Sequence, residues 1–260
     1  RDILHRLEQT EQLCHSLWNL VVKTLAAACA REGDLLIFNP LATQTQRVVK
    51  TILYSRADNI ALTYQGQAIP FDVLKRDVLR GGTAISLNAE GECETPLPPY
   101  YRWHVAVKTP VLPPVGYLSV NVEDDPAPFR QPEQTTGSEI ENAHYRLTLD
   151  DGTLTLQDKR NGRYIPSFFT LENCADAGDS YDFSPLAGDT PTRCDHFTLV
   201  DCLKTPLVEK LIVESTLFLP PHLAGRQDTA RTPLSIRLEC TLREDDPNLY
   251  VEASLENSHC

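Results

Sequence analysis

The spacing of apolar residues changes at Gly33, and this change divides the chain into a helical part and a β-rich part. Before Gly33, apolar residues recur every three or four positions without an interrupting Gly or Pro, as on one face of an α-helix. They are Ile3, Leu4, Leu7, Leu13, Leu17, Leu20, Val21, Val22, Leu25 and Ala28. The spacing predicts one amphipathic helix of about 28 residues. Its apolar stripe needs partner helices, and the rest of the sequence predicts none of comparable quality.

After Gly33, short apolar or alternating runs follow one another, separated by turns that contain Pro and Gly. The expected strands cover residues 47–54, 60–64, 103–108 and 118–123. This pattern predicts a small antiparallel β-domain over residues 34–125. Residues 81–99 are expected to form a long surface loop.

The stretch from Asp124-Asp125 to Gly137 is acidic, rich in Pro and without an apolar repeat, so residues 126–137 are interpreted as a linker. Beyond them, residues 145–149 and 154–157 alternate on either side of Asp151-Gly152, which is the strongest hairpin signal in the chain. Further strands are expected around residues 197–202, 207–218, 234–242 and 249–255. Residues 138–260 are therefore interpreted as the N-terminal part of a large domain similar to a β-sandwich. The predicted fold is mainly β, with residues 1–33 as the last helix of a helical bundle.

The composition limits the partners and the compartment. The formal net charge of the 260 residues is −12 and no run of Lys or Arg exceeds two, which argues against nucleic acid or an anionic membrane as partner. No apolar run approaches the roughly 20 residues that span a bilayer. The eight cysteines are scattered, so free thiols in a reducing cytoplasm are expected. The chain contains no Met, which predicts a missing upstream region unless modified methionines are absent from the printed sequence.

Residues 176–185 form the segment with the strongest chemical signal. Asp176, Asp179 and Asp182 stand at every third position, with Tyr181 and Phe183 between and beside them. Asp179 and Asp182 could act as the general acid and the nucleophile of a glycosidase. The alternative, which spacing alone favours, is a tight loop whose carboxylates accept backbone N–H groups and whose two aromatic rings pack onto the sheet. Serine-nucleophile elbows, phosphate-binding loops and zinc-protease motifs are absent, and residues 194–196 are interpreted as a turn entering a strand.

Five stretches of the chain read as known motifs: residues 140–149, 151–159 with 162–164, 178–185, 36–41 and 1–11. They are similar, respectively, to an ENxxYRL strand, a DGTLTLxDKRxG hairpin, a GDxYDYSP loop, a VFNPL strand and the helix that follows an active-site HDSI segment. These motifs belong to the α-mannosidases of glycoside hydrolase family 38, and the chain most closely resembles the bacterial branch with mannosylglycerate hydrolases. The likeness covers most of the chain.

The resemblance implies a parent enzyme that is a zinc-dependent retaining α-mannosidase, with mannosylglycerate as one candidate substrate. In that family, His and Asp side chains hold the zinc, one Asp attacks the anomeric carbon, and a second carboxylate protonates the leaving oxygen. The motifs that carry these residues precede Arg1. This chain is therefore expected to contain no catalytic residue, to bind no zinc and to be inactive alone. Its expected partners are an α-mannoside and the catalytic domain, and a homo-oligomer stays open.

The loop is the part of the family's active site that the resemblance does place in this chain. A Tyr of that loop hydrogen-bonds a sugar hydroxyl in the family, which makes Tyr181 the expected substrate contact. Asp179 and Asp182 are expected to support it or to fix the loop. Phe183 stands where the family more often has a second Tyr. The alternative function is a carbohydrate-binding or structural β-module without a catalytic role.

Overall fold

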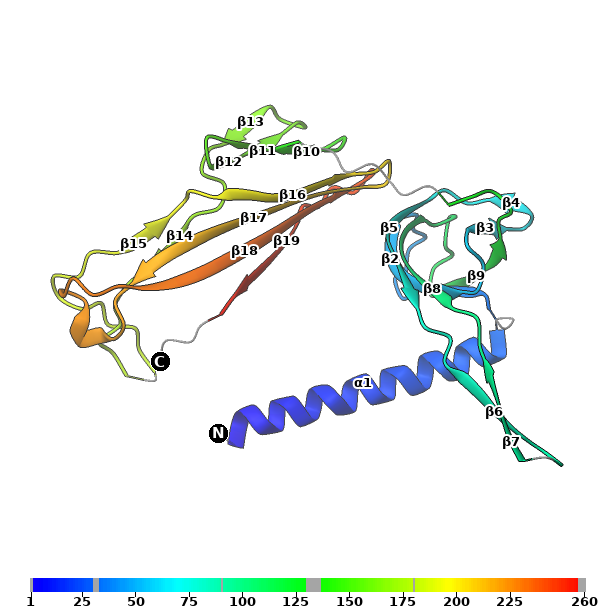
Figure 1. Cartoon of the computed structure of the whole chain (residues 1–260). Helices are drawn as coiled ribbons and strands as arrows, with labels where there is room; N and C mark the ends of the chain where they lie inside the picture. Colours follow the sequence, from blue (N-terminus) through cyan, green and yellow to red (C-terminus); the bar gives the residue numbers. More distant parts are fainter. Residues whose placement is uncertain (1, 30–32, 90, 130–136, 180, 257–260) are drawn as a thin grey trace. The chain divides into compact units, whose positions relative to one another are not determined.

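The structure is a computed structural model that describes residues 2–29, 33–89, 91–129, 137–179 and 181–256. Its contacts divide the chain into two units, Arg1–Gln131 and Pro132–Cys260 (Figure 1). The expected linker, residues 126–137, contains this boundary, and its residues 130–136 lie outside the described residues. The chain is mainly β, with several antiparallel sheets and α1 (Asp2–Cys29) as the α-helix of the described part, which confirms the predicted fold class.

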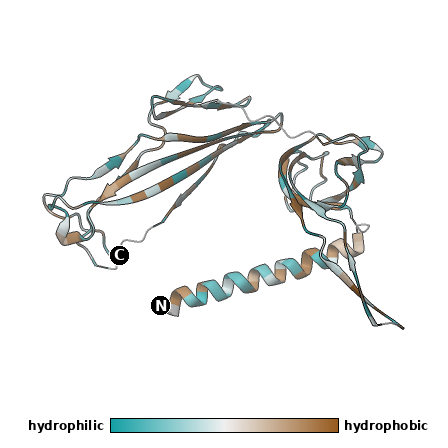
Figure 2. Ribbon diagram, in the orientation of Figure 1, coloured by the Kyte–Doolittle hydropathy of each residue, from teal (hydrophilic) through white to brown (hydrophobic). Residues whose placement is uncertain are grey.

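Helix α1 is 28 residues long and presents its apolar stripe to solvent. Figure 2 shows apolar residues recurring along its length. Exposed fractions of its large apolar residues range from 42% to 74%. These residues are Ile3, Leu4, Leu7, Leu13, Leu17, Trp18, Leu20, Val21 and Leu25. A stripe of this length is stabilised mainly by tertiary packing, and the described residues of the first unit leave it exposed.

The β part of the first unit consists of two larger antiparallel sheets and a hairpin. One sheet has the order β1-β9-β3-β4 and the other β2-β8-β5. The strands are β1 (Leu35–Asn39), β2 (Val48–Ser55), β3 (Ile60–Tyr64), β4 (Gln67–Ala68), β5 (Phe71–Leu79), β8 (Tyr100–Lys108) and β9 (Gly116–Asp124). Strand β5 was not among the expected strands, because four charged residues interrupt its apolar alternation.

Trp103 is at the centre of this unit and is fully buried. Its ring lies 5.1 Å from that of Phe129, edge to face, and 6.0 Å from that of Tyr101. The guanidinium of Arg76 covers the Trp103 ring at 5.3 Å, and it is held by the carbonyl oxygen and a carboxylate oxygen of Asp58 at 2.7 and 2.9 Å. A cation over aromatic faces and a buried indole together close the core against water.

Residues 81–99 do not form the expected loop. They contain β6 (Thr83–Asn88) and β7 (Gly91–Pro96), which pair as an antiparallel hairpin (Figure 1). Ile85 and Leu87 are exposed on this hairpin at 65% and 81%. The prediction was wrong because the glutamates of β7, opposite these apolar residues, made the segment look like a polar loop.

The second unit contains two four-stranded antiparallel sheets with a shared core and one short hairpin. The first sheet is β10 (Glu139–Glu141), β11 (Tyr145–Asp150), β12 (Thr153–Asp158) and β13 (Arg163–Ile165). The second is β16 (Thr198–Lys204), β17 (Val208–Leu219), β18 (Thr232–Arg243) and β19 (Tyr250–Leu255). Strands β14 (Leu171–Asn173) and β15 (Thr192–Cys194) form the hairpin. Buried residues of both large sheets belong to one hydrophobic cluster, so this unit is built as a β-sandwich.

Two local features fix how the strands of this sandwich are aligned. Asp151 and Gly152 have φ angles of 45° and 75°, which is the two-residue turn expected between β11 and β12. Asn142 links the β10–β11 connection to the far end of β18: its side-chain amide donates to the carbonyls of Arg243 and Asp246 at 2.9 and 3.0 Å. Its Oδ1 accepts the N–H groups of His144, just before β11, and of Tyr145, the first residue of β11. The Asn of the ENxxYRL motif thus has a structural function.

Because Trp103 is fully buried, replacing it with Ala should lower the free energy of unfolding by about 3–5 kcal/mol. Trp18, which is 64% exposed on α1, is the matched control, and Trp18→Ala should change that free energy by less than about 0.5 kcal/mol. Urea denaturation followed by far-ultraviolet circular dichroism measures both. Equal small effects of the two substitutions would contradict the central position of Trp103.

Candidate functional site

The candidate loop, residues 174–191, connects the two strands of the short hairpin in the second unit. Strands β14 and β15 pair from Leu171 with Cys194 to Asn173 with Thr192. The chain then continues as a narrow extension of the hairpin: the Leu186 N–H donates to the Ala175 carbonyl at 3.2 Å, and the Ala177 N–H donates to the Ser184 carbonyl at 2.7 Å. The loop therefore has a stem with defined backbone pairing.

Two of the three spaced aspartates hold the backbone of this loop. Asp176 Oδ1 accepts the N–H groups of Gly178 and Ser184, both at 2.9 Å. Asp179 Oδ1 accepts the N–H groups of Tyr181 and Asp182 at 2.8 and 3.2 Å. The carboxylates are thus used as caps for N–H groups that no sheet partner takes.

Gly178 is required by a close approach of the backbone. A Cβ atom at this position would lie 2.0 Å from the Asp182 carbonyl oxygen and 2.9 Å from the Ser184 nitrogen. Both contacts are far shorter than van der Waals distance, and the contacting atoms belong to the backbone. Any larger residue would have to open the loop.

The base of the loop is fixed by a nearly buried ion pair. Arg226 Nε and Nη2 donate to the two carboxylate oxygens of Asp189 at 2.8 and 2.9 Å, and the two side chains are only 8% and 9% exposed. Asp189 Oδ2 also accepts the Ala175 N–H at 2.7 Å. Arg226 further binds the Oδ1 atom and the carbonyl of Asn173. One guanidinium therefore ties both ends of the loop to the connection between β17 and β18.

These contacts favour the ionised forms of Asp176, Asp179 and Asp189. Arg226, followed by the Ala175 amide, lowers the pKa of Asp189 to about 2. The backbone amides of Ser184 and Gly178 lower the pKa of Asp176, and those of Tyr181 and Asp182 lower the pKa of Asp179. A general acid needs a raised pKa, so Asp179 is better suited to fixing the loop than to donating a proton.

The aromatic residues are at the tip and face solvent. Tyr181 is 91% exposed and Phe183 is 63% exposed. The expectation that both rings pack onto the sheet was therefore wrong, because backbone pairing, the carboxylate caps and the Asp189–Arg226 pair hold the loop while its two rings stay exposed. Asp182 is also exposed, and Ser180, which precedes Tyr181, lies outside the described residues.

Sequence reasoning did not identify Asp189, Arg226 and Asn173, which fix the base of the loop. Arg226 is 37 residues from Asp189 and follows the short 3-10 helix η1 (Leu223–Gly225). No local pattern connects the two positions. The sequence offered one indication of this pair, namely that Asp189 is an acidic residue in a segment that contains Pro and Gly.

In the residues that the structure describes, no group of three or more His, Cys, Asp or Glu side chains could hold a metal ion. Within the same residues, no helix is both long enough and apolar enough to cross a membrane.

No protein-family model matches the chain, and no curated protein is significantly similar to it. Solved structures do match. An α-mannosidase from Enterococcus faecalis V583 superimposes with a TM-score of 0.74 over 99% of this chain, at 17% identity. A glycosyl hydrolase family 38 protein from Enterococcus faecalis superimposes with a TM-score of 0.65 over 88% of this chain, at 15% identity.

At these identities the likeness establishes the fold: this chain is built like a segment of glycoside hydrolase family 38 α-mannosidases. The chain spans about a third of the two structures that it matches, 34% of the first and 32% of the second. The bacterial branch with mannosylglycerate hydrolases stays a prediction.

Because Arg226 pairs with Asp189 at the base of the loop, Asp189→Asn should loosen the stem without affecting the sandwich. We expect the amides of Ala175, Ala177 and Leu186 to exchange with solvent roughly tenfold faster or more, as measured by hydrogen–deuterium exchange. Exchange in the core strand β17 should stay unchanged. Asp228→Asn, an exposed aspartate close to Arg226 in sequence, should change none of these rates.

The same pair predicts a pH dependence. The pKa of Asp189 is lowered from 3.8 to about 2, so its contribution to loop stability is complete above about pH 4 and is lost as the pH falls towards 2. Loop protection, relative to the intrinsic exchange rate at each pH, should fall in this window. In Asp189→Asn this fall should be smaller, and an identical fall in both proteins would show that another group controls the loop.

Proposed function

We propose that this chain is the part of a zinc-dependent retaining α-mannosidase that follows the catalytic domain and supplies a substrate-contacting loop to its active site. The observation that carries this proposal is the loop itself: a phenol, Tyr181, is presented to solvent at the tip of a segment whose base is rigidly fixed. The fold shared with family 38 proteins supports the assignment of the parent enzyme.

The exposed helix supports a parent with a larger helical region. The apolar stripe of α1 is solvent-exposed from Ile3 to Leu25, and an isolated amphipathic helix gains little stability from its own hydrogen bonds. Helices of the parent would cover this stripe. The share of the solved structures that this chain spans, about a third, leaves room for a catalytic domain and its helices.

The rigid base of the loop supports a role in catalysis rather than in loose binding. A hydrogen-bond donor accelerates a reaction only when it is already in place where charge or strain develops in the transition state. The Asp189–Arg226 pair and the caps of Asp176 and Asp179 hold the backbone beside Tyr181 before any sugar binds. The Tyr181 hydroxyl would then bind a sugar hydroxyl without the entropic cost of ordering the loop.

Asp179 and Asp182 have different functions in this proposal. Asp179 fixes the turn through the amides of Tyr181 and Asp182. Asp182 is exposed beside Tyr181. In this proposal its carboxylate accepts a hydrogen bond from a substrate hydroxyl. Neither acts as nucleophile or general acid.

The zinc that the resemblance implies does not fit the described residues of this chain, because they contain no group of metal-binding side chains. In our proposal the zinc, its ligands, the nucleophile and the acid all belong to the catalytic domain of the parent enzyme. The contribution of this chain is to position a phenol, and the chain alone is inactive.

The substrate class is α-mannosides, after the mannosidases whose fold the chain shares. Mannosylglycerate is the more specific candidate, and relative kcat/KM values for it and for p-nitrophenyl α-mannoside would distinguish the two. We also propose a reducing compartment, the cytoplasm, for the parent. The seven cysteines within the described residues are free, which supports this assignment.

In the full-length parent, Tyr181→Phe should lower kcat/KM on p-nitrophenyl α-mannoside. Loss of one hydrogen bond whose partner is left unpaired costs about 1–3 kcal/mol, which corresponds to a factor of roughly 5 to 150. Steady-state hydrolysis kinetics measure this fall in kcat/KM. Tyr164→Phe is the matched control, because Tyr164 is also an exposed tyrosine of this unit, at 63%, and its change should leave kcat/KM unaltered.

Unchanged turnover of the Tyr181→Phe enzyme would eliminate the substrate contact and favour the alternative of a structural β-module. The sequence before Arg1 gives an independent check. A segment there with the family's His-Asp motif would supply the metal ligands and support the parent enzyme even if Tyr181 proved dispensable.

A further inference from the structure

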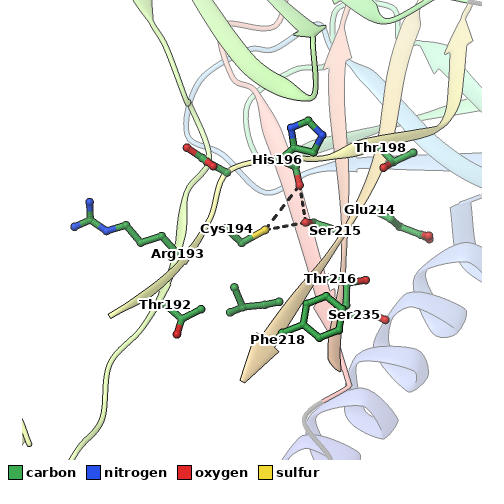
Figure 3. Close-up of a pocket in the computed structure, with 12 residues that line it drawn as sticks. Thr192, Arg193, Cys194, His196, Thr198, Glu214, Ser215, Thr216, Phe218 and Ser235 are labelled. Atoms are coloured by element: carbon green, nitrogen blue, oxygen red, sulfur yellow. Dashed lines mark hydrogen bonds between the residues drawn. The ribbon is translucent and has the colours of Figure 1, made fainter. Parts of the chain in front are cut away.

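A groove with many polar residues lies in the sandwich unit, along the part of β17 that β16 leaves uncovered (Figure 3). Strand β16 begins at Thr198, which pairs with Glu214, so the following residues of β17 up to Leu219 have no partner in β16. The chain before Thr198 turns away instead, through residues 194–196 to β15. The space left between them has a volume of about 660 Å³, within the range of roughly 300–1,000 Å³ typical of small-molecule sites.

Hydroxyl groups are the most numerous polar groups in the lining of this groove. The pairing of β17 with β18 places Thr216 opposite Ser235. Two residues earlier on β17, Glu214 is opposite Arg237, and two residues later Phe218 is opposite Pro233. Five residues of the lining carry hydroxyl groups, namely Thr192, Thr198, Ser215, Thr216 and Ser235. Hydroxyls both donate and accept, so this lining suits a ligand that is itself rich in hydroxyl groups.

The charges of the groove are largely compensated within the protein. Arg237 Nη1 donates to Glu214 Oε1 at 2.6 Å, and Arg193 Nε donates to Glu172 Oε2 at 2.6 Å. Asp195 adds a carboxylate to the lining. A phosphate or another anion would find no surplus of positive charge here, whereas the hydroxyls of a neutral ligand could donate to Asp195.

One aromatic ring stands at the end of this polar surface. Phe218 is 57% exposed, while the adjacent Leu217 is 5% exposed. In Figure 3 the ring lies beside Thr216 and Ser235, at the opposite end of the groove from His196. A flat apolar ring beside a row of hydroxyls matches a pyranose, which has an apolar face and polar edges.

The wall opposite Phe218 is fixed before any ligand binds. The Ser215 hydroxyl donates to the His196 carbonyl at 2.6 Å and lies 2.8 Å from the Cys194 sulfur (Figure 3). The His196 ring is packed against Gly152, where a Cβ atom would approach it to 2.0 Å. A groove that is already ordered loses little entropy when a ligand binds.

We propose that this groove binds a neutral glycan, with one pyranose ring stacked on Phe218 and its hydroxyl groups bonded to the side chains of Thr216 and Ser235, which lie on the same face of the sheet. The site is separate from the loop of Tyr181 and does not depend on the proposed function.

The test uses the 260-residue chain, labelled with nitrogen-15, and titration with α-linked mannotriose or with maltotriose followed by amide chemical shifts. We expect saturable shifts of the β17 and β18 amides around Thr216 and Ser235. Phe218→Ala should weaken binding roughly tenfold or more, and Ser235→Trp, which fills the groove from an exposed position, should abolish it. Phe183→Ala, a matched change of an exposed phenylalanine in the Tyr181 loop, should leave binding unchanged.

Three outcomes would overturn the proposal: no shift at tens of millimolar of either sugar, binding that survives both groove variants, or binding lost only in Phe183→Ala. The last outcome would place the sugar at the loop and would support the proposed function while eliminating the groove. Circular dichroism of each variant shows that the loss of binding is not a loss of fold.

Discussion

The ion pair of Asp189 and Arg226 controls the geometry of the second unit's functional loop. Arg226 comes from the connection of the longest hairpin, β17–β18, and Asp189 from the loop, so a rigid element positions a segment that has no core of its own. Both side chains are about nine-tenths buried. A buried ion pair is costly to desolvate, and this cost is offset because each guanidinium nitrogen of Arg226 donates to an acceptor.

The elements that could be predicted from sequence are those set by neighbouring residues. The hairpin at Asp151-Gly152 follows from the φ angles that this dipeptide favours, and α1 follows from its period. Strand β5 escaped prediction because Asp77 and its charged neighbours suggest a turn. In the sheet, Oδ2 of Asp77 accepts hydrogen bonds across the strands from Arg102 Nη2 and Nε, at 2.7 and 3.0 Å. This arrangement is visible only once β8 lies beside β5.

For the candidate site, sequence could suggest that Asp176 and Asp179 cap backbone amides, because such bonds span two to eight residues. It could not show that Tyr181 stays exposed, since exposure depends on where the sheets end. Nor could it reveal the groove beside Phe218. That groove arises from the residue at which β16 begins to pair, a property of three strands together rather than of any one of them.

The β6–β7 hairpin has a consequence for solubility. Ile85 pairs with Glu94 and Leu87 with Glu92, so each exposed apolar side chain faces a carboxylate across the two strands. A second hairpin that stacked on this face, or added a strand to its edge, would have to remove both carboxylates from water. Self-association through the β6–β7 hairpin is thereby penalised.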